Sequence, residues 1–224
     1  MSATRTYDAT RARVEGYFDR TATQVWDRLT SDAPVSRVRA TVRAGRDRMR
    51  GVMLSRLPSD LRGMRVLDAG CGTGAKTAAL AAQGATVVAV DISPKLLAIA
   101  SDRLDPAHAG RVTFAAADMF DADLGNFDAV VAQDSMIYYG APELAERLNA
   151  LAPRAGQVVF SLAPRTPLLM TMFWAGKAFP RADRSPAMVP HAAADLGPRL
   201  DGTLTEVERV TSGFYISTCL ELAP

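Results

Sequence analysis

A hydrophobic strand that runs directly into a glycine-rich turn is the feature that most constrains this chain. Residues 66–74 read Val-Leu-Asp-Ala-Gly-Cys-Gly-Thr-Gly, and a helical pattern follows them. Gly70, Gly72 and Gly74 let the backbone turn sharply and approach a ligand closely, because no Cβ stands in the way. Asp68, near the end of the strand, is expected to accept a hydrogen bond from a ligand amine. The spacing differs from the dinucleotide pattern G-x-G-x-x-G, and a tight turn without a ligand is the plainer alternative.

Two further acidic residues follow the next two strand patterns. Residues 86–90 form an apolar strand that ends in Asp91, about where an acidic group reaches ribose hydroxyls in doubly wound sheets. Residues 112–114 begin a third strand, which leads to Ala117-Asp118-Met119. Three acidic strand ends in register favour a bound nucleoside cofactor over an empty turn.

This arrangement resembles motif I of the Rossmann-like S-adenosylmethionine (SAM) methyltransferases. The resemblance implies that Asp68 and the glycine backbone hold the amino-acid portion of SAM, the methyl donor, with help from Gln133. Asp91 would bind the ribose, and Ile92 would pack on the adenine. Asp118 would accept from the adenine amino group beside Met119. The implied cofactor-binding set is Asp68, Gly70, Cys71, Gly72, Gly74, Asp91, Ile92, Asp118, Met119 and Gln133.

Length and composition suit one large α/β domain with a complete core, because the chain has 224 residues and is 48% apolar. It has no run of 18 apolar residues, and the polar start predicts no signal peptide, so we expect the protein in the cytoplasm. Its two cysteines, Cys71 and Cys219, are too few for a disulfide scaffold and predict buried thiols.

Positive charge is concentrated at the N-terminal end, although the net charge of the chain is only +2. Residues 1–65 carry 14 arginines against seven acidic residues. The arginines are interleaved with acidic and apolar positions, which favours solvated helix faces over a nucleic-acid surface. An anionic substrate or an acidic lipid surface stays open as a partner.

The order of the patterns predicts a class I methyltransferase fold. Alternating strands and helices from residue 63 imply parallel strands, and residues 204–210 and 214–220 form a closing hairpin through Ser212-Gly213. We therefore predict an α/β fold with a seven-stranded, mostly parallel sheet that ends in an antiparallel hairpin. Helical patterns at 7–29 and 35–57 precede the sheet. The predicted division is an N-terminal helical lid over 1–62 and a SAM-dependent methyltransferase domain over 63–224.

Two stretches are candidates for the substrate side. Residues 134–139, Asp-Ser-Met-Ile-Tyr-Tyr, follow the fourth strand at the edge where open sheets bind ligands, although Tyr138 and Tyr139 also suit ordinary packing. The insertion 163–191 is rich in Met, Leu and aromatic residues and is flanked by arginines. It suits core, a membrane-surface helix, or a wall for a flat apolar anion.

Several segments are similar to the magnesium-protoporphyrin O-methyltransferases of bacteriochlorophyll biosynthesis. They are residues 17–22, 68–74, 134–139, 179–181 and 213–215, and the likeness extends over nearly the whole chain. It implies methyl transfer from SAM to one propionate of magnesium protoporphyrin IX, giving the monomethyl ester and S-adenosylhomocysteine (SAH). Tyr17, Tyr138 and Tyr139 would serve at the reacting carboxylate. The implied substrate-binding residues are Arg165, Phe173, Trp174, Arg181, Arg184 and His191.

The chemistry of a propionate acceptor removes the need for a general base. Its pKa is about 4.3, as for Glu, so the carboxylate is already ionised at neutral pH. Tyr17 and Tyr138 would orient it, and the oxygenic branch of the family carries a His where Tyr138 stands. Magnesium would enter with the porphyrin, so no protein-bound metal is expected, and His191 is the better of two candidates for an axial ligand.

Two alternative functions stay open. A methyltransferase of a quinone or small aromatic hydroxyl would need a base, which Tyr139 or His191 would have to supply. The chain could also be a non-catalytic SAM-binding partner of the magnesium-inserting complex. Expected partners are the magnesium porphyrin, the porphyrin-binding subunit of magnesium chelatase, and, by peripheral contact, the cytoplasmic side of the inner or photosynthetic membrane; nucleic acid is not expected.

Overall fold

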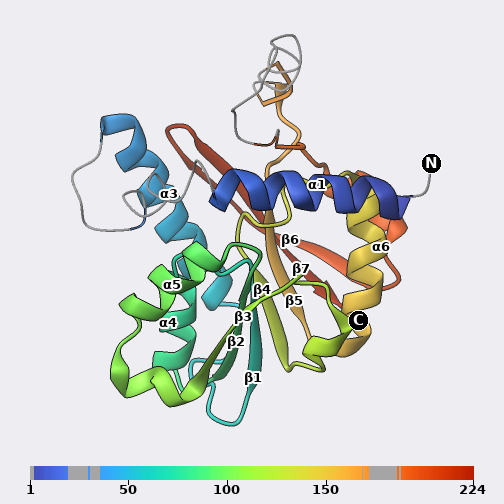
Figure 1. Cartoon of the computed structure of the whole chain (residues 1–224). Coiled ribbons are helices and arrows are strands. Elements are labelled where there is room, and N and C mark those ends of the chain that lie inside the picture. Colours follow the sequence, from blue (N-terminus) through green and yellow to red (C-terminus); the bar gives the residue numbers. More distant parts are fainter. Residues whose placement is uncertain (1–2, 20–29, 31–35, 168, 172–185, 187) are drawn as a thin grey trace.

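A seven-stranded mixed sheet forms the centre of the molecule (Figure 1). The computed structural model describes residues 3–19, 30, 36–167, 169–171, 186 and 188–224. The strand order is β3-β2-β1-β4-β5-β7-β6. The strands are β1 (Arg65–Ala69), β2 (Thr86–Asp91), β3 (Val112–Ala116), β4 (Ala129–Ala132), β5 (Val158–Leu162), β6 (Thr203–Ser212) and β7 (Tyr215–Ala223).

The pairing confirms the predicted topology. Strands β1 to β5 run parallel, whereas β7 pairs antiparallel with both β5 and β6. The order of the parallel strands reverses between β1 and β4, so their carboxyl ends diverge there and leave room for a ligand. The seven-stranded class I methyltransferase fold is therefore present, with the hairpin at its C-terminal edge.

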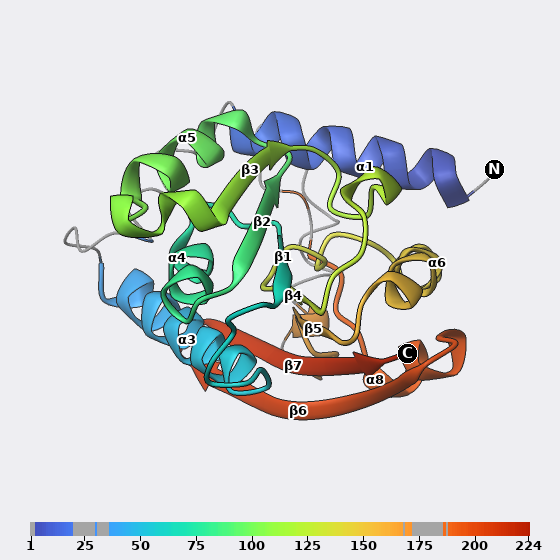
Figure 2. The same ribbon diagram turned by 90° about the horizontal axis from the view of Figure 1, so that it is seen from below.

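Helices cover both faces of the sheet (Figure 2). They are α1 (Ala3–Tyr17), α3 (Arg37–Leu54), α4 (Ala75–Ala82), α5 (Pro94–Arg103), α6 (Ala141–Leu151) and α8 (Ala193–Leu196), with 3-10 turns at Pro106–Arg111, Ala122–Leu124, Ala152–Arg154 and Gly197–Arg199. Neighbouring strand residues face opposite layers: Val66 packs with α3 and α4, and Leu67 with α1 and α6. None of the helices in the described ranges is long and apolar enough to cross a membrane.

The helix α3 is part of the layer that covers the sheet. Ser36 caps its N-terminus by accepting from the Arg39 amide at 3.4 Å, and Met49 and Met53 are fully buried against the sheet. A Cβ on Gly45 would lie 2.5 Å from Tyr215 Cδ1, which shows how closely α3 approaches β7. The predicted helix 35–57 is thus present but two to three residues shorter at each end. It covers the sheet and also borders one side of the pocket, and the lid over 1–62 stays a prediction.

The helix α1 runs across the end of the sheet where the strands of the parallel part terminate (Figure 1). It begins four residues before the predicted start at residue 7, and the two residues that follow it, 18 and 19, have π-helical geometry. Tyr7 and Val14 face inward and are buried. The remainder of the predicted helix, residues 20–29, lies outside the described residues.

The ends of the insertion 163–191 are joined by backbone hydrogen bonds. The Arg165 amide donates to the His191 carbonyl and the His191 amide to the Ala163 carbonyl, both at 2.8 Å. The apolar and arginine-rich positions 172–185, on which the substrate-wall prediction depends, lie outside the described residues. Strand β6 begins after α8, a short helix that the sequence pattern did not predict.

Candidate active site

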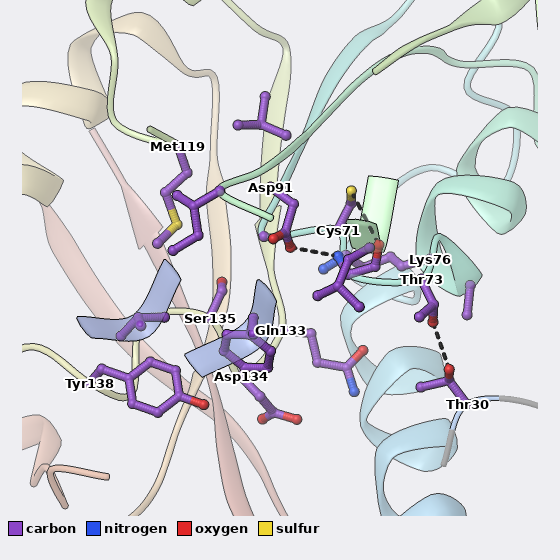
Figure 3. Close-up of a pocket in the computed structure, with 18 of the residues that line it drawn as sticks. Thr30, Cys71, Thr73, Lys76, Asp91, Met119, Gln133, Asp134, Ser135 and Tyr138 are labelled. Carbon is purple, nitrogen blue, oxygen red and sulfur yellow. Dashed lines mark hydrogen bonds between the residues drawn. The ribbon is translucent and has the colours of Figure 1, made fainter. Parts of the chain in front are cut away.

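A pocket of about 290 Å³ lies at the carboxyl ends of β1, β2 and β4. The glycine-rich turn forms its floor, α1 closes one side, and α3 borders the other. Figure 3 shows Asp91 and Met119 toward one end of this pocket, and Tyr138, Gln133 and Asp134 toward the other. Of the predicted cofactor set, the pocket is lined by Gly70, Cys71, Gly72, Asp91, Ile92, Asp118, Met119 and Gln133.

The glycine-rich turn has the backbone that the sequence predicts. Gly70 and Gly72 have φ values of +73° and +56°, which side chains rarely allow. A Cβ on Gly70 would lie 2.3 Å from Ser135 Cβ, whereas one on Gly72 would meet nothing within 4 Å. Gly70 therefore permits a close approach of two loops, and Gly72 leaves its backbone open to the pocket.

Asp91 holds the turn in place as well as lining the pocket. Its two carboxylate oxygens accept from the Gly72 amide and the Ser93 amide, both at 2.9 Å. Burial raises the pKa of Asp91 to about 6, and these two backbone donors only partly offset that effect. A ribose hydroxyl would be a further donor to this carboxylate.

Asp118 lies at the other predicted contact, that with adenine. The Tyr7 hydroxyl donates to its two oxygens at 2.7 and 2.9 Å, and the Phe120 amide donates at 3.0 Å. The Tyr7 ring stacks on Tyr139, with centroids 4.8 Å apart. Burial, the largest cause, and the nearby Tyr139 and Asp118 raise the pKa of Tyr7. The helix α1 is therefore fastened directly to a predicted cofactor residue, a contact that no sequence motif indicated.

Asp68 is not among the residues that line the pocket, and its contact with a ligand amine stays a prediction. It is fully buried; Lys76 Nζ lies 2.9 Å from one oxygen and the Thr77 hydroxyl donates to the other at 2.6 Å. The Oδ1 atom is buried and has no hydrogen-bond partner among the described residues, although the Lys76 ammonium lies close to it. Lys76, which sequence reasoning missed, lines the pocket instead. Gly74 also lies off the wall, where a Cβ would contact Ala100 at 2.8 Å.

The three tyrosines predicted at the substrate end are placed differently. Tyr138 and Tyr139 line the pocket and are buried. Burial and then the neighbouring Asp134 raise the pKa of Tyr138, and burial is the main cause that raises the pKa of Tyr139 to about 12. Tyr17 is not among the lining residues; its ring packs edge-on against Phe18, which does line the pocket. Tyr138 and Tyr139 would keep their protons at neutral pH, so a base role is disfavoured for both.

Arg165 and His191, the two predicted substrate-binding residues that the structure describes, do not line this pocket. Arg165 forms an exposed ion pair with Asp195 at 2.9 Å, and the His191 ring nitrogen Nε2 lies 3.0 Å from the Tyr139 carbonyl oxygen. Burial lowers the pKa of His191. Both residues border a separate, smaller pocket beside α8 and β6. Phe173, Trp174, Arg181 and Arg184 lie outside the described residues, so their roles stay predictions.

The helix α3 brings charged residues to the pocket that sequence reasoning did not single out. Arg46 forms an ion pair of 2.6 Å with Asp134, and its backbone carbonyl accepts a hydrogen bond from the side-chain amide nitrogen Nε2 of Gln133 at 2.8 Å. Arg43, Asp47 and Arg50 border the same side. The only available signal was the excess of arginine before residue 65. Within the described ranges, no group of three or more His, Cys, Asp and Glu is placed to hold a metal ion.

The fold and the pocket together define a class I SAM-dependent methyltransferase. A model of the methyltransferase domain matches residues 66–154, and a model of the magnesium-protoporphyrin IX methyltransferase C-terminus matches residues 132–224. The chain is 56% identical to magnesium-protoporphyrin O-methyltransferase of Rhodobacter capsulatus, over 97% of this chain and 98% of that protein. The chain belongs to the magnesium-protoporphyrin O-methyltransferase family.

More distant relatives agree with this assignment. The magnesium-protoporphyrin O-methyltransferase of Synechocystis is 30% identical over 93% of this chain and 94% of its own. A crystal structure of magnesium protoporphyrin IX methyltransferase from Synechocystis with bound SAH superposes with a TM-score of 0.79 at 28% identity, covering 94% of this chain and 97% of that one. Another structure of that enzyme contains bound SAM, with a TM-score of 0.77 at 25% identity and 96% of each chain covered.

Proposed function

We propose that this chain transfers the methyl group of SAM to a propionate carboxylate of magnesium protoporphyrin IX, giving the monomethyl ester and SAH, in bacteriochlorophyll biosynthesis. The observation that carries the proposal is the 56% identity over nearly both full lengths, which includes every element of the pocket. Sequence identity restricted to the half of the chain that contains the glycine-rich turn would support only the binding of SAM, not the choice of acceptor.

The pocket residues fit SAM as the methyl donor. Asp91 and Asp118 offer carboxylate oxygens at two strand ends, Met119 and Ile92 offer apolar surface beside them, and Gly72 exposes its backbone. When bound, SAM supplies a methyl group on a positively charged sulfur, which an oxygen nucleophile can attack directly. The protein's own part is to hold the two reactants in line and exclude water, which is worth about 7–11 kcal/mol in well-oriented systems.

The pKa values of the tyrosines that line the pocket favour a methyl acceptor that is already ionised. The pKa values of Tyr138 and Tyr139 are raised, so these residues donate hydrogen bonds rather than accept protons at neutral pH. His191 is turned toward the Tyr139 carbonyl and lines another pocket. A propionate needs no base, whereas a phenol with an ordinary pKa of about 10 does. This pattern favours the carboxyl acceptor over the quinone alternative.

The helix α1 is proposed as the lid, because Tyr7 connects it to Asp118 and Tyr139 over the pocket.

Membrane contact and transfer of the porphyrin from the porphyrin-binding subunit of magnesium chelatase are further proposals. The basic balance of residues 1–65 supports the proposal of peripheral attachment to an anionic membrane surface, which we place on its cytoplasmic side. Co-sedimentation with anionic vesicles at low salt tests the attachment; protein that stays in the supernatant contradicts it.

The experiment that tests the function compares acceptors. SAH release is measured with magnesium protoporphyrin IX, with its dimethyl ester and with a demethylated quinone. We expect release only with the free porphyrin acid. Release with the quinone at an equal or greater rate would support the alternative methyltransferase, and SAM binding without release for any acceptor would support a non-catalytic module.

A further inference from the structure

Asp134 has an unusual backbone at the end of β4. Its φ is +54°, and among the described residues it is the only non-glycine with positive φ. Asp tolerates this left-handed region better than most residues, but the conformation is still uncommon and needs support from its surroundings. The neighbouring Ser135 donates to the Ala69 carbonyl at 2.8 Å, so this strained turn is fastened to the glycine-rich turn.

The carboxylate of Asp134 is surrounded by donors from three elements. Arg46 of α3 lies at 2.6 Å from one oxygen; Ser161 of β5 and Tyr215 of β7 donate to the other at 2.8 and 3.1 Å. The Asp134 amide in turn donates to the Ser161 hydroxyl at 2.9 Å. The Asp134 side chain is only 9% exposed and that of Arg46 is 20% exposed. The pair is therefore mostly withdrawn from water.

This network borders the substrate end of the pocket. Asp134, Arg46 and Tyr138 all line the pocket, and Figure 3 shows the Asp134 carboxylate beside Tyr138. Asp134 also contributes to the raised pKa of both Tyr138 and Tyr215, which indicates that the charge lies near both hydroxyls. In the sequence this Asp stands out only as the first residue of the segment 134–139.

We propose that Asp134 is a positioning residue and that its ion pair with Arg46 balances the charge of the wall at which an anionic acceptor arrives. The inference rests on the proposed function, because it assumes that the acceptor is a carboxylate. Asp134 holds α3, β7 and the Tyr138 turn in one arrangement. Arg46 cancels a negative charge that would otherwise repel the incoming carboxylate in a partly desolvated site.

Substitutions of Arg46 and of Asp134 should have opposite effects on the affinity for the porphyrin. Arg46→Gln leaves the Asp134 carboxylate uncompensated, so affinity for an anionic porphyrin should fall. Asp134→Asn removes a negative charge from this wall, so affinity for the same porphyrin should stay equal or rise, while loss of positioning lowers the methyl-transfer rate. A purely structural ion pair would weaken porphyrin binding in both variants, because breaking a buried pair from either side disturbs the same fold.

The experiment measures the equilibrium Kd of magnesium protoporphyrin IX for the SAH-loaded protein, which requires no turnover. We expect at least a fivefold higher Kd for Arg46→Gln, and a Kd no higher than that of the wild type for Asp134→Asn. The double variant should return to within about twofold of the wild type. Single-turnover methylation by Asp134→Asn should be slowed at least tenfold. Equal increases in Kd for both single variants, or a double variant that multiplies the two effects, would overturn the proposal.

A second ion pair between α3 and the hairpin provides the matched control. Arg48 and Glu208 lie 2.7 Å apart, with side chains 63% and 41% exposed and outside the pocket lining. Arg48→Gln and Glu208→Gln should leave porphyrin affinity and rate unchanged.

SAM affinity by calorimetry should stay within about threefold in the Arg46 and Asp134 variants; a tenfold loss in both would assign the pair to the cofactor and overturn the proposal. Absent wild-type turnover would instead reject the proposed function.

Discussion

At the scale of single residues, Asp91 couples the cofactor pocket to pH. Its folded-state pKa of about 6 lies above the ordinary Asp value of about 3.9. Between these values the folded protein binds more protons than the unfolded chain does. This group's contribution to stability is therefore complete below about pH 4 and is lost as the pH rises through about 6. A bound ribose hydroxyl would favour the ionised carboxylate.

We predict that SAM affinity falls about tenfold from pH 7 to pH 5, because the carboxylate that accepts from the ribose is protonated below about pH 6. Calorimetric titration of SAM across this range measures it. Asp91→Asn should bind SAM more weakly at pH 7 and show a flat profile below it. A wild-type affinity that does not change between pH 7 and pH 5 would contradict the ribose assignment.

Two tyrosines compare a residue that lines the pocket with one that does not: Tyr138 is a lining residue and Tyr17 is not. Tyr138→Phe removes only a buried hydroxyl that lines the pocket, so we predict a fall in kcat of roughly tenfold, about 1.4 kcal/mol, with SAM affinity unchanged. We predict a fall of the same order for Tyr17→Phe if closure of α1 brings its hydroxyl to the acceptor. Single-turnover rates measure both; parental rates for Tyr17→Phe would leave that ring as packing for Phe18.

Residues fixed by a backbone motif were predictable, whereas those brought together by packing were not. Asp91, Asp118 and the glycines follow strand ends, so their shared edge could be inferred from spacing. Asp68 follows the same rule, but packing buries it off the pocket wall, beside the Lys76 ammonium and the Thr77 hydroxyl. Tyr7 and Arg46 reach the pocket from helices more than 80 residues away in sequence, as their contacts with Asp118 and Asp134 show.

At the scale of elements, α3 connects the sheet to the pocket. One face buries Met49 and Met53, and Gly45 lets the helix approach the Tyr215 ring. The residues that pair with Asp134 and border the pocket come from the same helix. Any displacement of α3 from β7 would therefore also move the wall.

We predict that Gly45→Ala destabilises the protein by about 1–3 kcal/mol, because the added Cβ would lie 2.5 Å from the Tyr215 ring and overpack the interface. Gly51→Ala in the same helix is the matched control: its Cβ meets nothing within 4 Å, and the better helix propensity of Ala should add about 0.5–1 kcal/mol. Denaturant unfolding of both variants checks this. Equal stabilisation by both substitutions would show that α3 does not pack as described.

Elements with regular periodicity could be predicted more fully than those shaped by tertiary contacts. The β6–β7 hairpin and the parallel strands were anticipated from apolar runs and turn residues. The ends of α3 were misplaced because Ser36 caps the helix and Ser55 ends it, while the apolar pattern continues to Leu57, which is buried outside the helix. The four-residue helix α8 has too few residues for a periodic signal.

At the scale of the whole molecule, the pocket is assembled around the carboxyl ends of the parallel strands by segments between Tyr7 and Tyr139. The glycine-rich turn and the ends of β2 and β4 line it together with α1, α3 and the turn after β4. Three arginines of the N-terminal segment, Arg43, Arg46 and Arg50, line this pocket, and Asp134 and Asp47 form ion pairs with two of them. The helix α3 thereby brings cations to a pocket that the common fold provides.

The measurement that tests the central claim most directly is mass spectrometry of the product made with SAM labelled in its methyl group. The account predicts one labelled methyl per magnesium protoporphyrin IX, present as an ester that mild alkali removes, with one SAH formed for each. A label that resists saponification, or SAH formed without a labelled porphyrin, would contradict it.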